Sequence, residues 1–187
     1  MKRLPLLLAL AAVALLGACR RAPEPAAASG ADKPSLTFQG FEARASHRGQ
    51  LVWEAKAVSA EVYRQGEKAM AKDVTMEYFV NGRRVSTGRA DRASMDLKLY
   101  DMDAEGNVVV HGANGVVLET PRLTWDNKRQ RASSTAHVRL TRGGTVLTGK
   151  GFSADRSLGD VRILEDVQAE AVSVQQLRKE ALKWPKR

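Results

Sequence analysis

The class of fold is decided by the stretch Val74-Thr75-Met76-Glu77-Tyr78-Phe79-Val80-Asn81-Gly82-Arg83-Arg84-Val85-Ser86-Thr87-Gly88-Arg89-Ala90. Asn81-Gly82 suits the two positive-φ positions of a type I′ turn, and alternating residues flank it on both sides. Pairing outward from the turn predicts three opposed pairs, Val80 with Arg83, Tyr78 with Val85 and Met76 with Thr87. The predicted inner face carries Val74, Met76, Tyr78, Val80 and Val85, and the outer face carries Thr75, Glu77, Arg84, Ser86 and Gly88, with Phe79 as the exception. This pattern is typical of a half-buried antiparallel hairpin.

The same plan recurs along the chain. Turn signals lie at Arg48-Gly49, Asn81-Gly82, Asn114-Gly115 and Gly143-Gly144, so the intervals between their second residues are 33, 33 and 29. Between Leu36 and Val172 there is one proline, Pro121, and 13 of the 15 glycines. A repeat of this length with two or more strands per unit predicts an all-β, stacked or rolled antiparallel architecture whose inner faces form a continuous apolar trough. Whether six to ten such strands close into a barrel is left open by the sequence.

The N-terminus has the features of a cleaved export signal. Lys2 and Arg3 precede an apolar segment, residues 4–16, that is too short to span a bilayer. The following Leu16-Gly17-Ala18-Cys19 resembles the bacterial lipobox, in which the cysteine is acylated after cleavage. We therefore expect a lipoprotein signal peptide at residues 1–18 and a lipidated Cys19 that begins a proline-containing linker, residues 19–35. The alternative is an ordinary secretory cleavage beside a free cysteine.

Catalytic and metal-binding patterns are weak. His47, His111 and His137 are widely separated, and none has the spacing of a metal ligand. The acidic run Asp101, Asp103 and Glu105 suggests a calcium loop, but counting from Asp101 places Gly112 where an EF-hand needs glutamate. An acidic hairpin loop is the interpretation we favour. We predict no catalytic residue, no metal site and no cofactor.

Two blocks of the sequence resemble the LptC family, the membrane-tethered periplasmic component of lipopolysaccharide export. The first begins Val108-Val109-Val110-His111-Gly112-Ala113-Asn114-Gly115 and runs through Val116-Val117-Leu118-Glu119-Thr120-Pro121-Arg122-Leu123-Thr124-Trp125-Asp126. The second is Val138-Arg139-Leu140-Thr141-Arg142-Gly143-Gly144-Thr145-Val146-Leu147-Thr148-Gly149-Lys150-Gly151-Phe152-Ser153-Ala154-Asp155. The resemblance implies an open antiparallel β-jellyroll, here over residues 36–172, whose trough binds the acyl chains of lipopolysaccharide.

The resemblance also implies partners and a direction of transfer. The first strand, near residues 36–45, would face the inner-membrane ABC transporter, and the last, near residues 161–171, would face an LptA-like protein. The function expected is that of a noncatalytic, lipid-anchored carrier that passes lipopolysaccharide between them. Two other hypotheses remain: an adaptor lipoprotein with a packed core whose edges join envelope proteins, and an envelope hydrolase using Asp101, Asp103 or His111.

Apolar residues on the predicted inner faces are the candidate lipid-binding groove, although each is also compatible with a dry core. These are Met76, Tyr78, Val85, Val138, Leu140 and Leu147. Burial of acyl chains there is favourable because each exposed methylene costs about 0.8 kcal/mol.

The predicted location is the periplasmic side of the inner membrane, through acylated Cys19. This anchor differs from the uncleaved transmembrane helix usual in LptC proteins. In many proteobacteria aspartate after the acylated cysteine retains a lipoprotein at the inner membrane; because that position is Arg20, the outer membrane is an alternative location.

The net charge of +9 is unevenly placed. Residues 36–172 hold 20 basic and 18 acidic side chains, which leaves +2, while residues 173–187 carry 5 basic residues and 1 acidic residue, or +4. A nearly neutral domain argues against a nucleic-acid partner. The basic tail is expected to be a short amphipathic helix or a solvated terminus.

Overall fold

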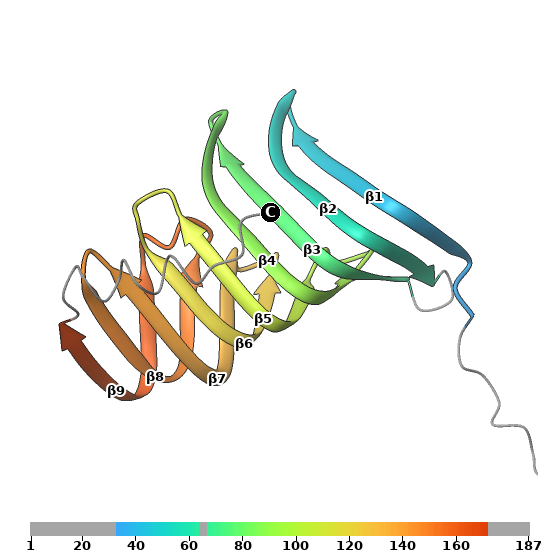
Figure 1. Cartoon of the computed structure of the whole chain (residues 1–187). Helices are drawn as coiled ribbons and strands as arrows, with labels where there is room; N and C mark the ends of the chain where they lie inside the picture. The colour runs from blue at the N-terminus through green and yellow to red at the C-terminus, as the bar shows by residue number, and fades with distance from the viewer. Residues whose placement is uncertain (1–32, 64–66, 172–187) are drawn as a thin grey trace, which may run out of the picture. The chain divides into compact units, whose positions relative to one another are not determined.

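A computed structural model describes residues 33–63 and 67–171, and within these ranges every regular element is a strand. Nine strands pair antiparallel in one sheet in chain order (Figure 1). They are β1 (Leu36–His47), β2 (Gln50–Tyr63), β3 (Lys68–Val80), β4 (Arg83–Asp96), β5 (Met102–Gly112), β6 (Val117–Asp126), β7 (Arg131–Arg142), β8 (Thr145–Asp155) and β9 (Val161–Ala171). Because β1 and β9 are the two edges, the sheet is open, which excludes the closed barrel.

Several expectations concern residues outside those ranges. They are the signal peptide 1–18, Cys19, the linker up to residue 32 and the tail 173–187. In the part of the chain that the structure describes, no helix has the length and apolar character needed to cross a membrane.

The predicted turns are confirmed at one end of the strands. Arg48-Gly49 and Asn81-Gly82 both have positive φ at the two central positions, 50° and 79° in the first and 51° and 72° in the second, as a type I′ turn requires. Gly143-Gly144 has φ of 57° and 97°, and Asn114-Gly115 also lies between strands. The repeat of about 30 residues is therefore one hairpin plus its return connection.

The predicted register of the central hairpin is wrong beyond its first pairs. Val80 does pair with Arg83, but a bulge between Tyr78 and Phe79 then places Tyr78 opposite Ser86. The bulge leaves Val85 without a partner in β3, and its carbonyl accepts a hydrogen bond from Ala113 N at 2.8 Å instead. Because one extra residue reverses the side-chain alternation, Ser86 and Gly88 join the inner face.

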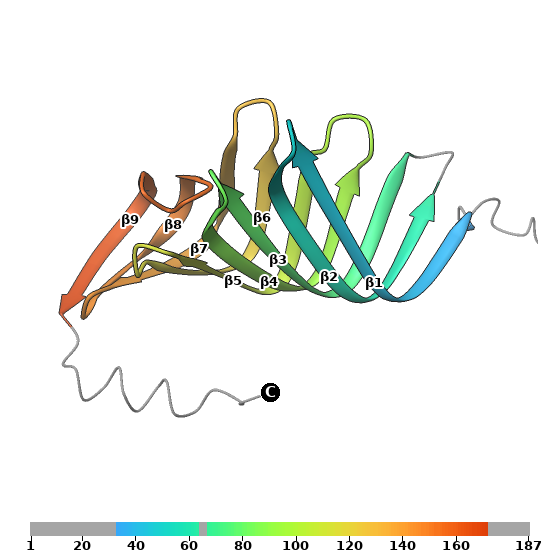
Figure 2. The same cartoon turned by 90° about the horizontal axis from the view of Figure 1, so that it is seen from above.

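A line of bends crosses the sheet and folds it (Figure 2). Positive φ angles mark this line, at Gly40 (66°), Asp73 (51°), Gly106 (75°), Gly151 (70°) and Asp166 (54°). Each of these residues lies where the pairing between neighbouring strands is interrupted. Aligned bends bring the two arms of each strand toward each other, as required of a jellyroll rather than a flat sheet.

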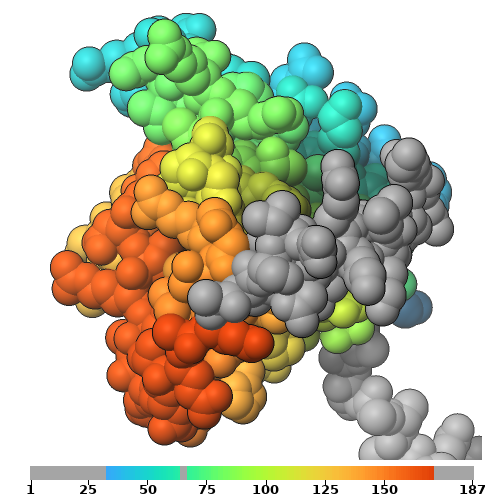
Figure 3. All heavy atoms as spheres, turned by 60° about the vertical axis from the view of Figure 1, so that its left-hand side comes forward, coloured from blue at the N-terminus to red at the C-terminus, as the bar shows by residue number. Residues whose placement is uncertain are grey.

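The two ends of the sheet are filled differently. In β1–β4 the buried residues are only Ala57, Ala60 and Ser86. The later strands and their turns contribute the buried hydrophobic residues of the core, Val108, Val109, Val116, Leu118, Trp125, Ala132, Val138, Val146, Phe152, Ala154 and Leu158. Figure 3 shows the side of the domain where the orange and red atoms of β7–β9 pack closely together. The C-terminal strands therefore hold a dry core, and the N-terminal strands do not.

Candidate functional site

A cavity of about 360 Å³ lies between the arms of the folded sheet. Residues from β1 to β8 contribute to its wall, so it runs along the sheet rather than sitting beneath one loop. Ten alanines line it: Ala43, Ala55, Ala57, Ala60, Ala69, Ala71, Ala90, Ala93, Ala104 and Ala132. Because an alanine side chain is one methyl group, facing alanines leave space where leucine or phenylalanine would interdigitate. The cavity exists because many of the inner positions of β2–β4 carry alanine.

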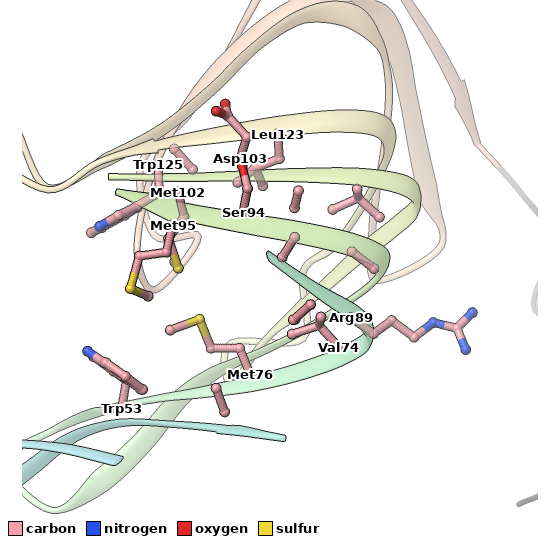
Figure 4. A pocket seen from close by; sticks show the side chains of 18 of the residues that line it. Trp53, Val74, Met76, Arg89, Ser94, Met95, Met102, Asp103, Leu123 and Trp125 are labelled. Atoms are coloured by element: carbon pink, nitrogen blue, oxygen red, sulfur yellow. The ribbon is translucent and has the colours of Figure 1, made fainter. Parts of the chain in front are cut away.

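Large adaptable side chains stand at one end of the cavity. In Figure 4, Trp53 and Trp125 lie on opposite sides, and the side chains of Met76, Met95 and Met102 extend into the space between them. Methionine is flexible and polarizable, so it packs against apolar groups of different shapes. The end of the cavity is thus bounded by groups that can accommodate a variable apolar guest.

Tyr78 connects this end to the core. Its ring centroid lies 5.6 Å from that of Trp125, with the planes tilted by 39°. Burial raises the pKa of the Tyr78 hydroxyl, and the nearby positive charge of Arg156 offsets part of that rise. The hydroxyl is therefore protonated and neutral at physiological pH.

The six predicted groove residues separate into two groups. Met76 and Tyr78 line the cavity, whereas Val85, Val138, Leu140 and Leu147 lie outside its lining. Val138 is 3% exposed and belongs to the dry core, against which Leu140 packs.

The alanines of β2–β4 were not identified from the sequence. Their signal was the alternation of small residues, as at Ala55 and Ala57 in β2 and Ala69 and Ala71 in β3. Large apolar residues were chosen as the candidate groove, but such residues usually fill cores, and Val138 lies in the core.

The acidic run is part of a strand rather than a hairpin loop. Asp103 and Glu105 lie in β5, and only Asp101 precedes it. Asp101 Oδ1 accepts a hydrogen bond from Asn127 N at 2.8 Å, and Asp103 Oδ1 accepts one from the Thr124 hydroxyl at 2.7 Å. Each carboxylate thus has a separate structural partner, and over residues 33–63 and 67–171 no group of three possible metal ligands is found.

The outer face of the sheet carries cross-strand ion pairs. Examples are Arg44 Nε to Glu54 Oε2 at 3.1 Å and Arg122 Nη2 to Glu105 Oε1 at 3.0 Å. Exposed pairs of this kind contribute little to stability. Because their charges are paired, the outer face of the sheet is polar and close to neutral. The inner face is apolar.

Comparison with known proteins gives two matches. The family model described as "Lipopolysaccharide-assembly, LptC-related" matches residues 6–172. The crystal structure of LptH from Pseudomonas aeruginosa, described as the LptA homologous periplasmic component of the conserved lipopolysaccharide transport device, superposes with a TM-score of 0.50. That match has 11% sequence identity and covers 63% of this chain and 93% of LptH, so it establishes the shared fold, an open β-jellyroll. No curated protein sequence matches this chain significantly.

Proposed function

The chain belongs to the LptC-related family of lipopolysaccharide-assembly proteins, and on that basis we propose that it is a noncatalytic, lipid-anchored carrier of lipopolysaccharide. In this role the cavity takes the acyl chains, and the chain passes the lipid from the inner-membrane ABC transporter to an LptA-like protein. The sugars stay in water, because only the inner face of the sheet is apolar.

The observation that carries the proposal is the unfilled, alanine-lined cavity beside a filled core. A packed adaptor domain gains nothing from leaving 360 Å³ empty, because unfilled apolar space forfeits packing contacts. An acyl chain supplies the missing contacts, and each methylene moved from water contributes about 0.8 kcal/mol. The site therefore fits a long, flexible apolar guest, which its methionines can follow.

The two edges of the open sheet support the proposed hand-off. An edge strand presents unpaired backbone donors and acceptors that another strand can complete. Leu36 and Phe38 on β1 and Leu164 and Val167 on β9 are exposed hydrophobic residues at these edges. We assign β1 to the transporter and β9 to the LptA-like partner, so that the trough continues from one protein into the next.

The anchor and location are also part of the proposal. Acylated Cys19 would tether the domain at the periplasmic face of the inner membrane, with the linker supplying reach. Membrane fractionation of cells that express the full chain tests this location. Recovery with the inner membrane supports the transfer role, and recovery with the outer membrane, the location that Arg20 suggests, contradicts it.

In-cell photo-crosslinking tests lipid binding directly. Val74 and Thr75 are neighbours in β3, but Val74 lines the cavity and Thr75 is exposed and outside the lining. A photo-reactive phenylalanine analogue at Val74 should give lipopolysaccharide adducts, and the same analogue at Thr75 should give none. Equal adduct yields at the two positions would show that lipid contact is nonspecific.

The adaptor remains the second candidate, because its edges are equally open. It predicts protein adducts from Phe38 in β1 and from Val167 in β9 together with no lipid adduct from Val74. The carrier predicts adducts of both kinds, so the same set of variants separates the two functions.

A further inference from the structure

A second, smaller hollow adjoins the end of the apolar cavity that Trp53 and Trp125 bound. Its volume is about 100 Å³, and eight of its lining residues also line the large cavity. Arg156, in the turn after β8, is the cationic residue common to both. None of the residues that line the smaller hollow is acidic; they are Val52, Trp53, Met76, Tyr78, Met95, Tyr100, Met102, Trp125, Asn127, Gln130 and Arg156.

Arg156 differs from the other half-buried arginines of the described chain. Arg131 pairs with Asp160 at 3.0 Å and Arg139 pairs with Glu119 at 3.3 Å, whereas no described carboxylate lies within ion-pair distance of Arg156. Its guanidinium carbon instead lies 6.0 Å from the ring centroid of Trp125. A partly desolvated guanidinium without a counter-ion is a favourable position for an incoming anion.

The surrounding structure holds Arg156 in place. Its carbonyl accepts a hydrogen bond from the buried Ser86 hydroxyl at 2.6 Å, which ties the turn to β4. The neighbouring Asp155 makes no ion pair with it; the Asp155 carboxylate instead accepts hydrogen bonds from the Ser157 hydroxyl at 2.5 Å and from Asp160 N at 3.0 Å. The cation is therefore positioned by the fold and left available.

Tyr78 supplies a second donor beside it. Its hydroxyl makes no hydrogen bond with the described residues, and burial keeps it protonated. Asn127 and Gln130, the amides of the same hollow, bond each other, with Gln130 Nε2 donating to Asn127 Oδ1 at 3.1 Å. A cation and a free hydroxyl donor thus converge where the apolar cavity ends.

We propose that Arg156 and Tyr78 form a phosphate-binding site for the headgroup of the lipid whose acyl chains occupy the cavity. The inference rests on the proposed function, because it takes the occupant of the cavity to be a phosphorylated glycolipid. The site orients the lipid: the acyl chains enter the alanine-lined cavity, and a phosphate stays at its rim on the guanidinium. Arginine suits this task because its planar fork can make two parallel hydrogen bonds to phosphate oxygens.

The test uses the full-length chain in phosphatidylcholine vesicles, with the photo-reactive analogue at Val74, which lines the large cavity but not the smaller hollow. Diphosphorylated lipid A and its dephosphorylated form are titrated separately, and adducts are identified by mass. We expect Arg156→Gln to raise the half-saturating concentration of the diphosphorylated lipid about tenfold, a loss of about 1.4 kcal/mol, and to leave that of the dephosphorylated lipid unchanged. Tyr78→Phe should act in the same direction by a smaller factor.

Arg83→Gln is the matched control, because Arg83 is exposed at the start of β4 and lies outside both linings. If wild type binds both lipids equally, or if Arg156→Gln weakens both equally, the phosphate site is refuted while lipid carriage stands. If inorganic phosphate binds through Arg156 while wild type does not favour the diphosphorylated lipid, the site binds free phosphate and the headgroup assignment is wrong. If neither lipid gives an adduct at Val74, lipid carriage itself is refuted, and the phosphate site with it.

Discussion

Removing a large side chain should cost much more stability in the C-terminal half of the sheet than in the N-terminal half. Phe152 in β8 is 0% exposed and belongs to the core cluster; one side of it borders the cavity, but Phe152→Ala removes its contacts with the buried side chains around it. Such substitutions cost about 3–5 kcal/mol. Met76 in β3 is only half-buried and borders the open cavity, so Met76→Ala enlarges a space that already exists. We expect it to cost less than about 1 kcal/mol.

Thermal unfolding followed by circular dichroism measures the contrast. At about 3 °C per kcal/mol for a domain of this size, Phe152→Ala should lower the Tm by about 10 °C. Met76→Ala should lower it by about 3 °C or less. Leu118→Ala, at the other large side chain that is fully buried, is the positive control. If Met76→Ala destabilises as much as Phe152→Ala, the N-terminal half is a packed core and our interpretation of the cavity is refuted.

Three further outcomes follow from the geometry. Gly149→Ala should destabilise the domain by about 1–3 kcal/mol, because the added Cβ would lie 2.5 Å from Ile163 Cγ2 in β9. Amide hydrogen exchange in β9 should therefore be faster, and unchanged exchange would contradict this. Gly88→Leu should leave the Tm unchanged, because Gly88 has no positive φ and its side faces the cavity. It should lower the yield of lipid adducts at Val74 about tenfold, because the leucine displaces about two methylene contacts of the lipid, worth about 1.6 kcal/mol. Burial alone would raise the pKa of the Asp155 carboxyl, but hydrogen bonds led by that from the Ser157 hydroxyl hold it below its usual value. The stability that Asp155 adds is therefore complete above the unfolded-state pKa and is lost as pH falls through the lower folded-state pKa. Asp155→Asn should consequently lower stability at pH 7 and reduce the further loss on acidification; an unchanged pH profile of unfolding would refute the assignment.

The strand pairing was predictable where the turn residues are decisive. Asn81-Gly82 and Gly143-Gly144 can adopt positive φ at low cost, so they locate hairpins without knowledge of the rest of the chain. The register of β3 and β4 was not predictable past Tyr78. The chain can pair there with or without a bulge, and which pairing forms depends on the burial of side chains by the rest of the fold. Phe79, which interrupts the alternation, was the sign of that bulge in the sequence.

The candidate site was predictable only in part, since a sequence shows which residues are apolar but not which of them face empty space. Of the predicted groove residues, Met76 and Tyr78 line the cavity, while Val138 is also hydrophobic and lies in the dry core. Arg156 was not identified from the sequence, because its proposed role depends on its position beside Trp125 and Tyr78, which are 31 and 78 positions away in the chain.

By itself, the sequence determined the strand-rich fold, the hairpin repeat and the family resemblance, since these depend on local backbone preferences and on alternation along one strand. The tertiary structure confirmed that the sheet is open, as the resemblance implied. It alone decided that the sheet bends along a line through Gly106 and Asp73, and that the alanines of β2–β4 face one another across an unfilled space. The physical reason is that a cavity is a property of opposed surfaces. Small side chains on one strand leave room for a guest only when the fold places other small side chains opposite them.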